Sequence, residues 1–275
     1  MQWAFFALIG LLSGFLGGLL GIGGGSVIVP ALLFLLPVLG IQGADLPQVA
    51  IASSLAIIIP SSLSSARTHA QCRAVDWHAL ARLAPGVLAG SAAGTVLAAA
   101  IGGRLLLATF IAFATFAIVR LLRPARTDVS AQEGAPALPG PAVLSLAGAG
   151  IGLMSSMVGV GGGILSVPFL AGYIPLRRAI GTAAALGLPL AIAGMLGYMA
   201  AGHSQACGSS CLGYVYLPAV LATSLAAVAS APFGARLAHR WPVPRLKQAF
   251  AALLAIVIAD LALRLARDVA ENWLA

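Results

Sequence analysis

Residues 18–40 read GLLGIGGGSVIVPALLFLLPVLG, an apolar stretch that contains no charged residue and is interrupted by three consecutive glycines, Gly23–Gly25. A glycine inside a helix costs roughly 1 kcal/mol relative to alanine, so three together mark a break between two helices. Apolar and polar residues do not alternate along the stretch, which argues against a half-buried strand. The stretch therefore predicts two apolar helices joined by a glycine turn.

The rest of the chain has the same character, because 60% of its 275 residues are hydrophobic and only 8% are charged. A soluble domain carries about 25% charged residues, so this chain has too few to cover a surface that faces water. Within lipid, only helices or a closed barrel satisfy every backbone hydrogen bond. The continuous apolar runs at 144–158 and 250–263 lack the alternation of a barrel strand. We therefore expect an all-α integral membrane protein.

The glycine motif occurs twice. Gly21–Gly25, followed by Val29-Pro30, recurs as Gly159–Gly163, followed by Val167-Pro168. Four further matches follow in the same order, namely AIAS at 50–53 with AIGT at 179–182, Pro60 with Pro189, Gly94 with Gly234, and Phe110 with Phe250. Ordered matches indicate a duplication. The predicted division is a first repeat at 1–122, a polar Pro- and Ala-rich linker at 123–141, and a second repeat at 142–275.

Ten apolar segments are expected, at 4–20, 26–39, 48–66, 78–100, 104–122, 142–158, 164–173, 177–200, 214–237 and 246–265. Segments 26–39 and 164–173 are shorter than the 20 or so residues of a simple span. Each repeat is therefore predicted to hold a glycine-broken helical hairpin and three transmembrane helices. The two ends of such a repeat lie on opposite sides of the membrane, so the second repeat would be inverted.

The basic residues test this arrangement. Twelve of the fifteen fall on one predicted side, namely Arg67, Arg73, Arg82, Arg120, Arg123, Arg126, Arg177, Arg178, Arg236, Arg240, Arg245 and Lys247, whereas Arg104, Arg264 and Arg267 fall on the other. The positive-inside rule makes the richer side cytoplasmic. We thus expect a bacterial inner-membrane protein with both termini outside and the linker inside. Because the net charge of +8 lies in short loops, no nucleic-acid partner is expected.

The two glycine clusters are also the best candidate site. New helices are expected to begin directly after them, near Ser26 and Ile164. A helix N-terminus offers free N–H groups and partial positive charge, and glycine lets a ligand approach that backbone. Inverted repeats would aim two such termini at each other near the midplane, an arrangement that transporters use for anions. The alternative is that these glycines only allow close helix packing.

The motifs GLLGIGGGSVIVPALLFL, VGVGGGILSVPFLAGY, AIASS with AIGTA, and GYVYLPAV with APFGARLAHR resemble the TauE/SafE (sulfite exporter) family of membrane permeases. The resemblance implies transport of sulfite, an organosulfonate or a related sulfur anion such as thiosulfate. It also implies that an ion gradient drives this transport. It implies a substrate site at Gly23, Gly24, Gly25, Ser26, Gly161, Gly162 and Gly163, together with the hydroxyls of Ser53, Ser54 and Thr182. The second repeat carries Ala183 and Ala184 next to Thr182, so this site would be lopsided.

Other polar residues have simpler interpretations. Ser61, Ser62, Ser64 and Ser65 are expected mainly to bond their own helix or to aid packing. Arg67 and His69 are expected to form a solvated cluster at the cytoplasmic end of their segment. Asp260 is expected to pair with Arg264 rather than to carry protons. Cys207 and Cys211 lie in a predicted outer loop, where a small disulfide is the leading interpretation.

The sequence allows three functions. The leading hypothesis is a secondary transporter for a small anion, with the lipid bilayer as its environment and H⁺ or Na⁺ as coupling ion. A passive anion channel of the same fold is the alternative. An intramembrane Ser/His hydrolase is disfavoured, because His69, His78, His203 and His239 are all expected near interfaces, away from a buried serine. No cofactor motif, metal-ligand spacing or ATP-binding sequence occurs, so no cofactor is expected.

Overall fold

The structure is a computed structural model that describes residues 2–21, 23–122, 137–202 and 210–238, with six single positions between 255 and 265. For residues 120–122 it describes the backbone alone. Most of the predicted linker, most of the predicted segment 246–265 with Asp260 and Arg264, and Cys207, His203 and His239 lie outside the described residues.

The described residues form nine helices and one small hairpin. The helices are α1 (Gln2–Leu20), α2 (Gly25–Val38), α3 (Leu46–Gln71), α4 (Trp77–Ala100), α5 (Gly103–Leu122), α6 (Pro141–Val158), α7 (Gly163–Leu170), α8 (Leu176–Ala201) and α9 (Leu217–Ala238). The strands β1 (Cys211–Leu212) and β2 (Val215–Tyr216) pair antiparallel between α8 and α9. The predicted helical class is confirmed for these residues, whereas the hairpin was not predicted.

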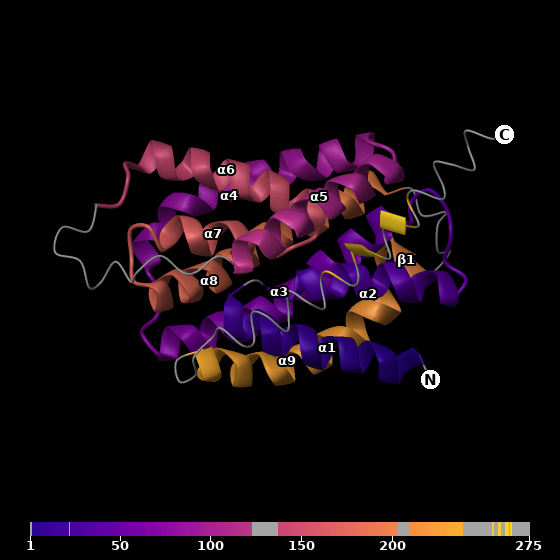
Figure 1. Ribbon diagram of the computed structural model, residues 1–275, viewed down its shortest axis with the longest axis horizontal. Helices are drawn as coiled ribbons and strands as arrows, with labels where there is room; N and C mark the ends of the chain where they lie inside the picture. Colours follow the sequence, from indigo (N-terminus) through magenta and orange to yellow (C-terminus); the bar gives the residue numbers. More distant parts are fainter. Residues whose placement is uncertain are drawn as a thin grey trace.

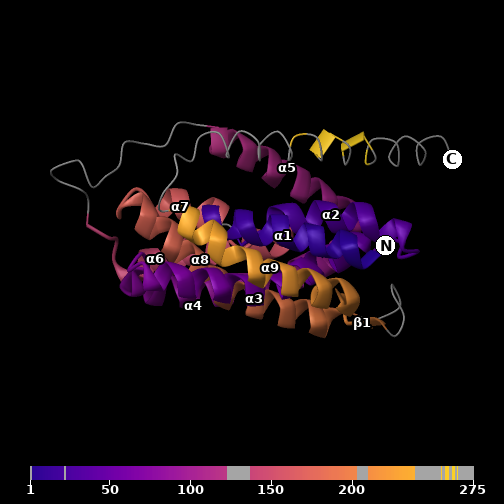
Figure 2. The same cartoon turned by 90° about the horizontal axis from the view of Figure 1, so that it is seen from below.

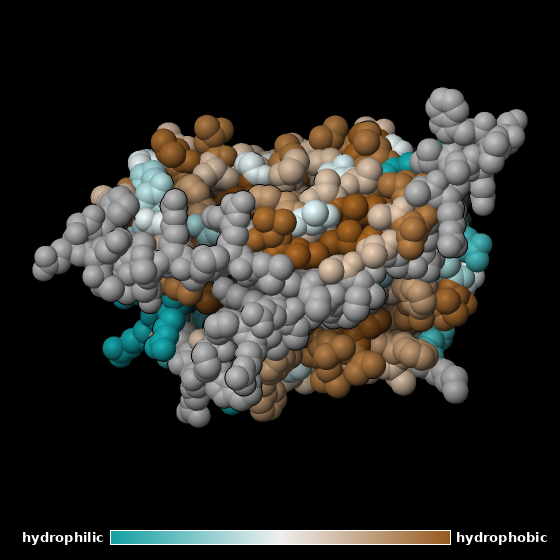
Figure 3. Space-filling model, viewed as in Figure 1, coloured by the Kyte–Doolittle hydropathy of each residue, from teal (hydrophilic) through white to brown (hydrophobic). Residues whose placement is uncertain are grey.

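Six of these helices are long and apolar enough to cross a membrane, namely α1, α3, α4, α6, α8 and α9. Their outer faces carry large apolar side chains, and Leu146 and Leu225 are each 76% exposed. Figure 3 shows hydrophobic residues over the middle of the visible face and hydrophilic ones toward the two ends of the long axis. Such a surface suits a hydrocarbon layer about 30 Å thick. The chain is therefore a multi-pass membrane protein.

The arms of each glycine-broken hairpin differ in length. The first arms, α1 and α6, have 19 and 18 residues. The second arms, α2 and α7, have only 14 and 8 residues. At 1.5 Å per residue, α7 is about 12 Å long, much less than a bilayer core. Each hairpin thus pairs a membrane-length arm with a shorter one.

Close helix pairs form the two sides of the bundle. In Figure 1, α4 and α6 lie together along one side and α1 and α9 along the other, with α3, α7 and α8 between them. Figure 2 shows α5 lying apart, along one face of the bundle. Glycines allow both close pairs, because they lack a Cβ. A Cβ on Gly14 of α1 would meet the Ala227 carbonyl of α9, and one on Gly90 of α4 would meet the Ala149 carbonyl of α6. Small residues of this kind bring helix backbones into contact in membranes.

The α4–α6 pair gives a stability prediction. A Cβ on Gly152 would meet the Val87 carbonyl and lie 2.8 Å from the Ser91 nitrogen, and neither backbone atom can move aside. Gly152→Val should therefore lower the melting temperature of the detergent-solubilised protein by about 3–10 °C, as expected for overpacking. Gly150→Val is the matched control, because Gly150 has open space around it. Equal melting temperatures for the two variants would contradict this packing.

One helix end differs from its prediction. Segment 48–66 was expected to end before Arg67, but α3 continues to Gln71 and the chain then turns at Arg73, which has a φ of 52°. Arg67 is exposed, as expected, whereas His69 is fully buried. Two residues along a helix turn the side chain by about 200°, so these neighbours point to opposite sides. The prediction of a solvated Arg67–His69 cluster is wrong for His69.

Candidate functional site

The first glycine cluster forms a tight turn between α1 and α2. Gly21, Gly23 and Gly24 have φ values of 69°, 71° and 74°, a left-handed conformation that glycine adopts without steric cost. Gly24 is the N-cap of α2, and its carbonyl accepts the N–H groups of Val27 and Ile28. The start of any helix leaves its first N–H groups without intrahelical partners. The turn therefore presents the N-terminus of α2 inside the bundle.

The second cluster repeats this geometry between α6 and α7. Gly159 caps the end of α6 with a φ of 73°, and Gly162 caps the start of α7 with a φ of 77°. The Gly162 carbonyl accepts the N–H groups of Leu165 and Ser166. One detail differs, because Gly161 is not left-handed whereas its counterpart Gly23 is. Both predicted helix starts are confirmed within one residue of their expected positions.

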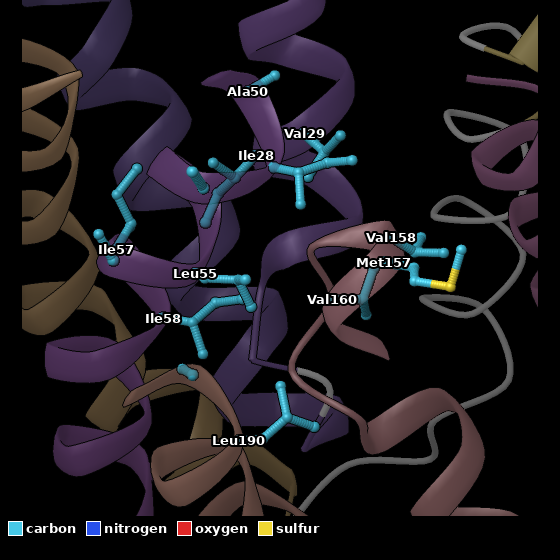
Figure 4. Packing of buried hydrophobic residues seen from close by; sticks show 14 of the residues in the cluster. Ile28, Val29, Ala50, Leu55, Ile57, Ile58, Met157, Val158, Val160 and Leu190 are labelled. Atoms are coloured by element: carbon cyan, nitrogen blue, oxygen red, sulfur yellow. The ribbon is translucent and has the colours of Figure 1, made fainter. Parts of the chain in front are cut away.

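The two turns touch each other. A Cβ on Gly23 would lie 3.0 Å from the Gly161 Cα, and one on Gly25 would meet the Gly159 carbonyl oxygen. Ser54 of α3 contacts the second turn, since its hydroxyl donates a 2.8 Å hydrogen bond to the Gly159 carbonyl. Figure 4 shows the buried apolar side chains around this contact. Residues from the two predicted repeats thus form one centre, with two helix N-termini close together.

A narrow hollow opens beside this contact. It is lined by Gly14, Gly17 and Gly18 of α1, by Gly23, by Ser61, Ser62 and Ser65 of α3, and by Ala184 of α8. None of these residues is charged, and the hollow is too narrow to hold a water molecule in this conformation. A Cβ on Gly187 would lie 2.8 Å from the Ser62 hydroxyl and 3.2 Å from the Gly161 carbonyl oxygen. Ser62 therefore connects the hollow to the second glycine turn.

Four buried hydroxyls at this centre have no hydrogen-bond partner among the described residues, namely those of Ser26, Ser62, Ser65 and Ser155. These serines are at most 3% exposed. Leaving a buried polar group unpaired costs about 1–3 kcal/mol, so such groups usually have a water or a ligand as partner. Ser62 and Ser65 line the hollow, Ser26 directly follows the first glycine turn, and the Ser155 hydroxyl would lie 3.7 Å from a Cβ on Gly162. Gln48, Thr223 and Ser224 also carry unpaired atoms, but they do not line the hollow. The unpaired serines make the centre a set of neutral donors.

Ser53 and Thr182, which the resemblance placed in the site, hold loops of the opposite half. Ser53 of α3 accepts a 2.9 Å hydrogen bond from the Tyr216 N–H in β2. Thr182 of α8 accepts a 2.9 Å bond from the Asp76 N–H, just before α4. Both side chains are fully buried. These bonds give the two hydroxyls a structural role, whether or not they also reach a substrate.

The sequence interpretation missed three residues, Ser62, Ser65 and His69. The serines were expected mainly to bond their own helix, but the hydroxyls of Ser62 and Ser65 make no bond to any described residue. His69 was expected to be solvated, but it is fully buried and its Nε2 donates a 2.9 Å hydrogen bond to the Gly18 carbonyl. The spacing of 61, 65 and 69 places a polar stripe on one face of an apolar helix, and that pattern was the available signal.

The structure does not pair Ser65 with His69 Nε2 as a nucleophile with its base. A serine nucleophile needs its base within hydrogen-bond distance, but the Ser65 hydroxyl is unpaired and His69 Nε2 bonds the Gly18 carbonyl. Within the described part of the chain, no group of three His, Cys, Asp or Glu side chains could hold a metal ion. In the β1–β2 hairpin, Cys211 is disulfide-bonded, whereas Cys72 after α3 is an exposed free thiol.

Comparison with known proteins gives the family. A family model described as Sulfite exporter TauE/SafE matches residues 6–261. A "Probable membrane transporter protein" of Haemophilus influenzae is 32% identical to this chain, over 94% of it and 97% of the relative. A relative with the same description from Methanocaldococcus jannaschii is 25% identical over 91% of both chains.

The Bacillus subtilis protein YunE, also described as a probable membrane transporter protein, is 42% identical over a shorter stretch, 28% of each chain. No solved structure matches this chain. The family match extends far beyond the glycine motifs, over nearly the whole chain, and it confirms the resemblance that those motifs carry. This multi-pass membrane protein belongs to the sulfite exporter TauE/SafE family of membrane transporters.

Proposed function

We propose that this chain is a secondary transporter for a small sulfur-containing anion, such as sulfite, thiosulfate or an organosulfonate. The observation that carries the proposal is the meeting of two glycine-capped helix N-termini beside buried serines whose hydroxyls have no partner among the described residues. Oriented N–H groups and hydroxyls bind anions, and the positive ends of two helices repel cations. The substrate-binding residues of this proposal are the two glycine turns with Ser26, Ser53, Ser54 and Thr182, extended by Ser62 and Ser65.

A neutral site suits a transported anion. Removing an anion from water is costly, and the hollow offers no Lys or Arg to compensate. Backbone and hydroxyl donors supply the missing hydrogen bonds without a fixed opposite charge. A full charge would hold the anion more tightly, whereas transport requires release on the other side. This chemistry favours a small oxyanion that accepts several hydrogen bonds at once.

Reciprocal packing supports two equivalent repeats. In the two repeats α1 is equivalent to α6, α4 to α9 and α3 to α8. Exchanging the halves therefore turns the close pair α1–α9 into the close pair α6–α4, and it leaves the contact between α3 and α8 unchanged. The glycine turns follow the same rule, since Gly21 abuts the Ile180 carbonyl and Gly159 abuts Ile51. The bonds that Ser53 and Thr182 accept from opposite loops are also exchanged in this way. Such exchange is expected of two halves related by a pseudo-twofold axis.

The repeats differ where the hollow lies, which favours a carrier over a channel. An offset of 129 residues relates α3 to α8, and it pairs Ser61 with Leu190, Ser62 with Ala191, Ser65 with Gly194 and Ala184 with Leu55. The equivalent space in the second half is thus occupied by Leu55 and Leu190, both fully buried. A channel needs a continuous polar path, whereas a carrier opens one side at a time.

Membrane topology gives one prediction. Cys72, an exposed thiol in the α3–α4 loop, and a cysteine introduced at Ser130 in the linker should react with an impermeant maleimide only from the cytoplasm. A C-terminal tag should be accessible only from outside, as the distribution of basic residues predicts. The Ser130→Cys probe requires a Cys72→Ser background. Finding the linker and the C-terminus on the same side would contradict the inverted repeats.

The function is tested by binding and flux on purified protein. Calorimetry should detect at least one of sulfite, thiosulfate or a short alkanesulfonate, with sulfate and chloride as comparison anions. In proteoliposomes, an imposed H⁺ or Na⁺ gradient should drive uptake of the bound anion against its own gradient. Flux that follows only the anion's own gradient would identify a channel. Absence of binding to all the sulfur anions would refute the proposed substrate class.

A further inference from the structure

The two central helices, α3 and α8, run antiparallel beside the glycine turns. A Cβ on Gly187 of α8 would lie 2.8 Å from the Ser62 hydroxyl of α3, whereas one on Gly194, about two turns later, would lie 2.8 Å from the Leu55 Cδ1. The later residue of α8 thus meets the earlier residue of α3. The hollow lies at the Ser62 contact, toward the end of α3. The Leu55 contact lies toward the β1–β2 hairpin, since Ser53 accepts an N–H of β2.

Exchanging the two halves places a second space at the Leu55 contact. The offset of 129 residues relates α3 to α8, and one of 138 residues relates Gly21 to Gly159. Applied to the lining of the hollow, these offsets give Gly152, Ser155, Ser156, Gly161, Leu190, Ala191, Gly194 and Leu55. Gly17 of the hollow thus corresponds to Ser155, whose buried hydroxyl has no hydrogen-bond partner among the described residues. An unpaired buried hydroxyl suits a space that a ligand enters in another state.

Two leucines fill this second space. The Leu190 Cδ1 lies 3.0 Å, and the Ser155 hydroxyl oxygen 3.7 Å, from the position that a Cβ on Gly162 would take. Leu190 therefore lies against the start of α7, on the side of Ser155. Leu55 reaches the same space from α3, and both leucines are fully buried in the apolar cluster of Figure 4. Their side chains separate the start of α7 from the hairpin side.

We infer that Leu55 and Leu190 are the gate that closes the anion path on the hairpin side. The first half carries Ala184 and Ser61 at the equivalent positions, and there the hollow remains. Large apolar side chains in a narrow passage exclude water and ions, so they close it without any charge. When the leucines move aside, Ser155 and the α7 N-terminus become reachable from the hairpin side. The inference rests on the proposed function and names residues that would alternate its access.

The gate is tested by exchanging residues between the two halves. Leu55→Ala and Leu190→Ser, made together, give the second space the residue types that line the hollow at the equivalent positions. The reporter is Ser155→Cys in a Cys72→Ser background, labelled in detergent with a small charged methanethiosulfonate. The double change should speed labelling of this thiol by about tenfold or more, because the thiol then faces water. Unchanged labelling in a monodisperse protein would overturn the inference.

Leu83→Ala is the matched control for the loss of a buried leucine. Leu83 of α4 is fully buried as well, but it lies at the α4–α6 contact, where a Cβ on Gly148 would meet its carbonyl. Gly148 is about two turns away from Ser155 along α6. The control should leave labelling of the Ser155→Cys thiol as it is without the change. Leu190→Ser alone, a milder change, should act in the same direction as the double variant.

Flux in proteoliposomes gives a second test. The double variant should let thiosulfate run down its own gradient without an ion gradient, because the path no longer closes on one side. The reverse exchange, Ser61→Leu, should fill the hollow and stop flux. A leak of the same size with Leu83→Ala would overturn the inference. If labelling rises as expected but no sulfur anion binds or moves in any variant, the proposed substrate class fails and the gate does not.

Discussion

Ser62→Val is expected to weaken anion binding by about 100-fold. The Ser62 hydroxyl is 1% exposed, has no partner among the described residues, and lies between the hollow and the second glycine turn. Losing a hydrogen bond to a charged ligand costs about 1.5–3 kcal/mol, or roughly 10- to 150-fold in affinity. The added methyl groups also fill a hollow that is already narrow. Calorimetry with the tightest-binding sulfur anion measures the change.

Ser64→Val is the matched control, two residues further along α3. The Ser64 hydroxyl donates a 3.1 Å hydrogen bond to the Val228 carbonyl of α9, on a different face of the helix from the hollow. Its replacement should alter stability slightly and affinity by less than about threefold. If the two variants bind the anion equally well and both are monodisperse, the hollow is not the binding site.

Gly162→Val should remove measurable binding, a loss of more than about 100-fold. Gly162 caps α7 with a φ of 77°, a conformation that strains a β-branched residue, and its Cβ would lie 3.0 Å from the Leu190 Cδ1. The isopropyl group would also cover the first N–H groups of α7, where the anion is proposed to bind. Binding is measured by calorimetry, after size-exclusion chromatography has shown a monodisperse protein.

Gly172→Val controls for the change of residue type. Gly172 follows α7, has no left-handed φ, and has only the Phe169 carbonyl, at 3.4 Å from a built Cβ, as a near neighbour. It should bind normally. Because valine strains the Gly162 turn, Gly162→Ala is a milder second test, with an expected loss of about tenfold from strain and partial covering. Normal anion binding in both Gly162 variants would exclude the α7 N-terminus as part of the anion-binding site.

The helices and the glycine turns were predictable because their causes are local. Gly23–Gly25 and Gly161–Gly163 break the apolar pattern, and the structure starts α2 at Gly25 and α7 at Gly163. The family could be recognised from the same motifs. The β1–β2 hairpin was not predictable, because each strand has only two residues and periodicity needs more.

The side-chain roles depend on contacts between distant segments, and local sequence does not contain them. Nothing near His69 in sequence shows that the Gly18 carbonyl of α1 will cover it. The bonds of Ser53 and Thr182 likewise reach loops more than 100 positions away. The repeat did predict that these two positions correspond, and the structure gives them corresponding partners. It could not predict that one hollow would be lined by serines and its counterpart filled by leucines.

The pairing of α1 with α9 has a consequence for biogenesis. The ribosome completes α1 before the other described helices, yet a Cβ on Gly14 of α1 would meet the Ala227 carbonyl in α9, the last of the fully described helices. At 5–20 residues per second, roughly 10–40 s of synthesis separate these two residues. The glycine face of α1 must therefore stay in lipid, or beside an insertion chaperone, for that time, while the α4–α6 pair can already assemble. The bundle would then mature from the α4–α6 pair outward, and α1 would join it late.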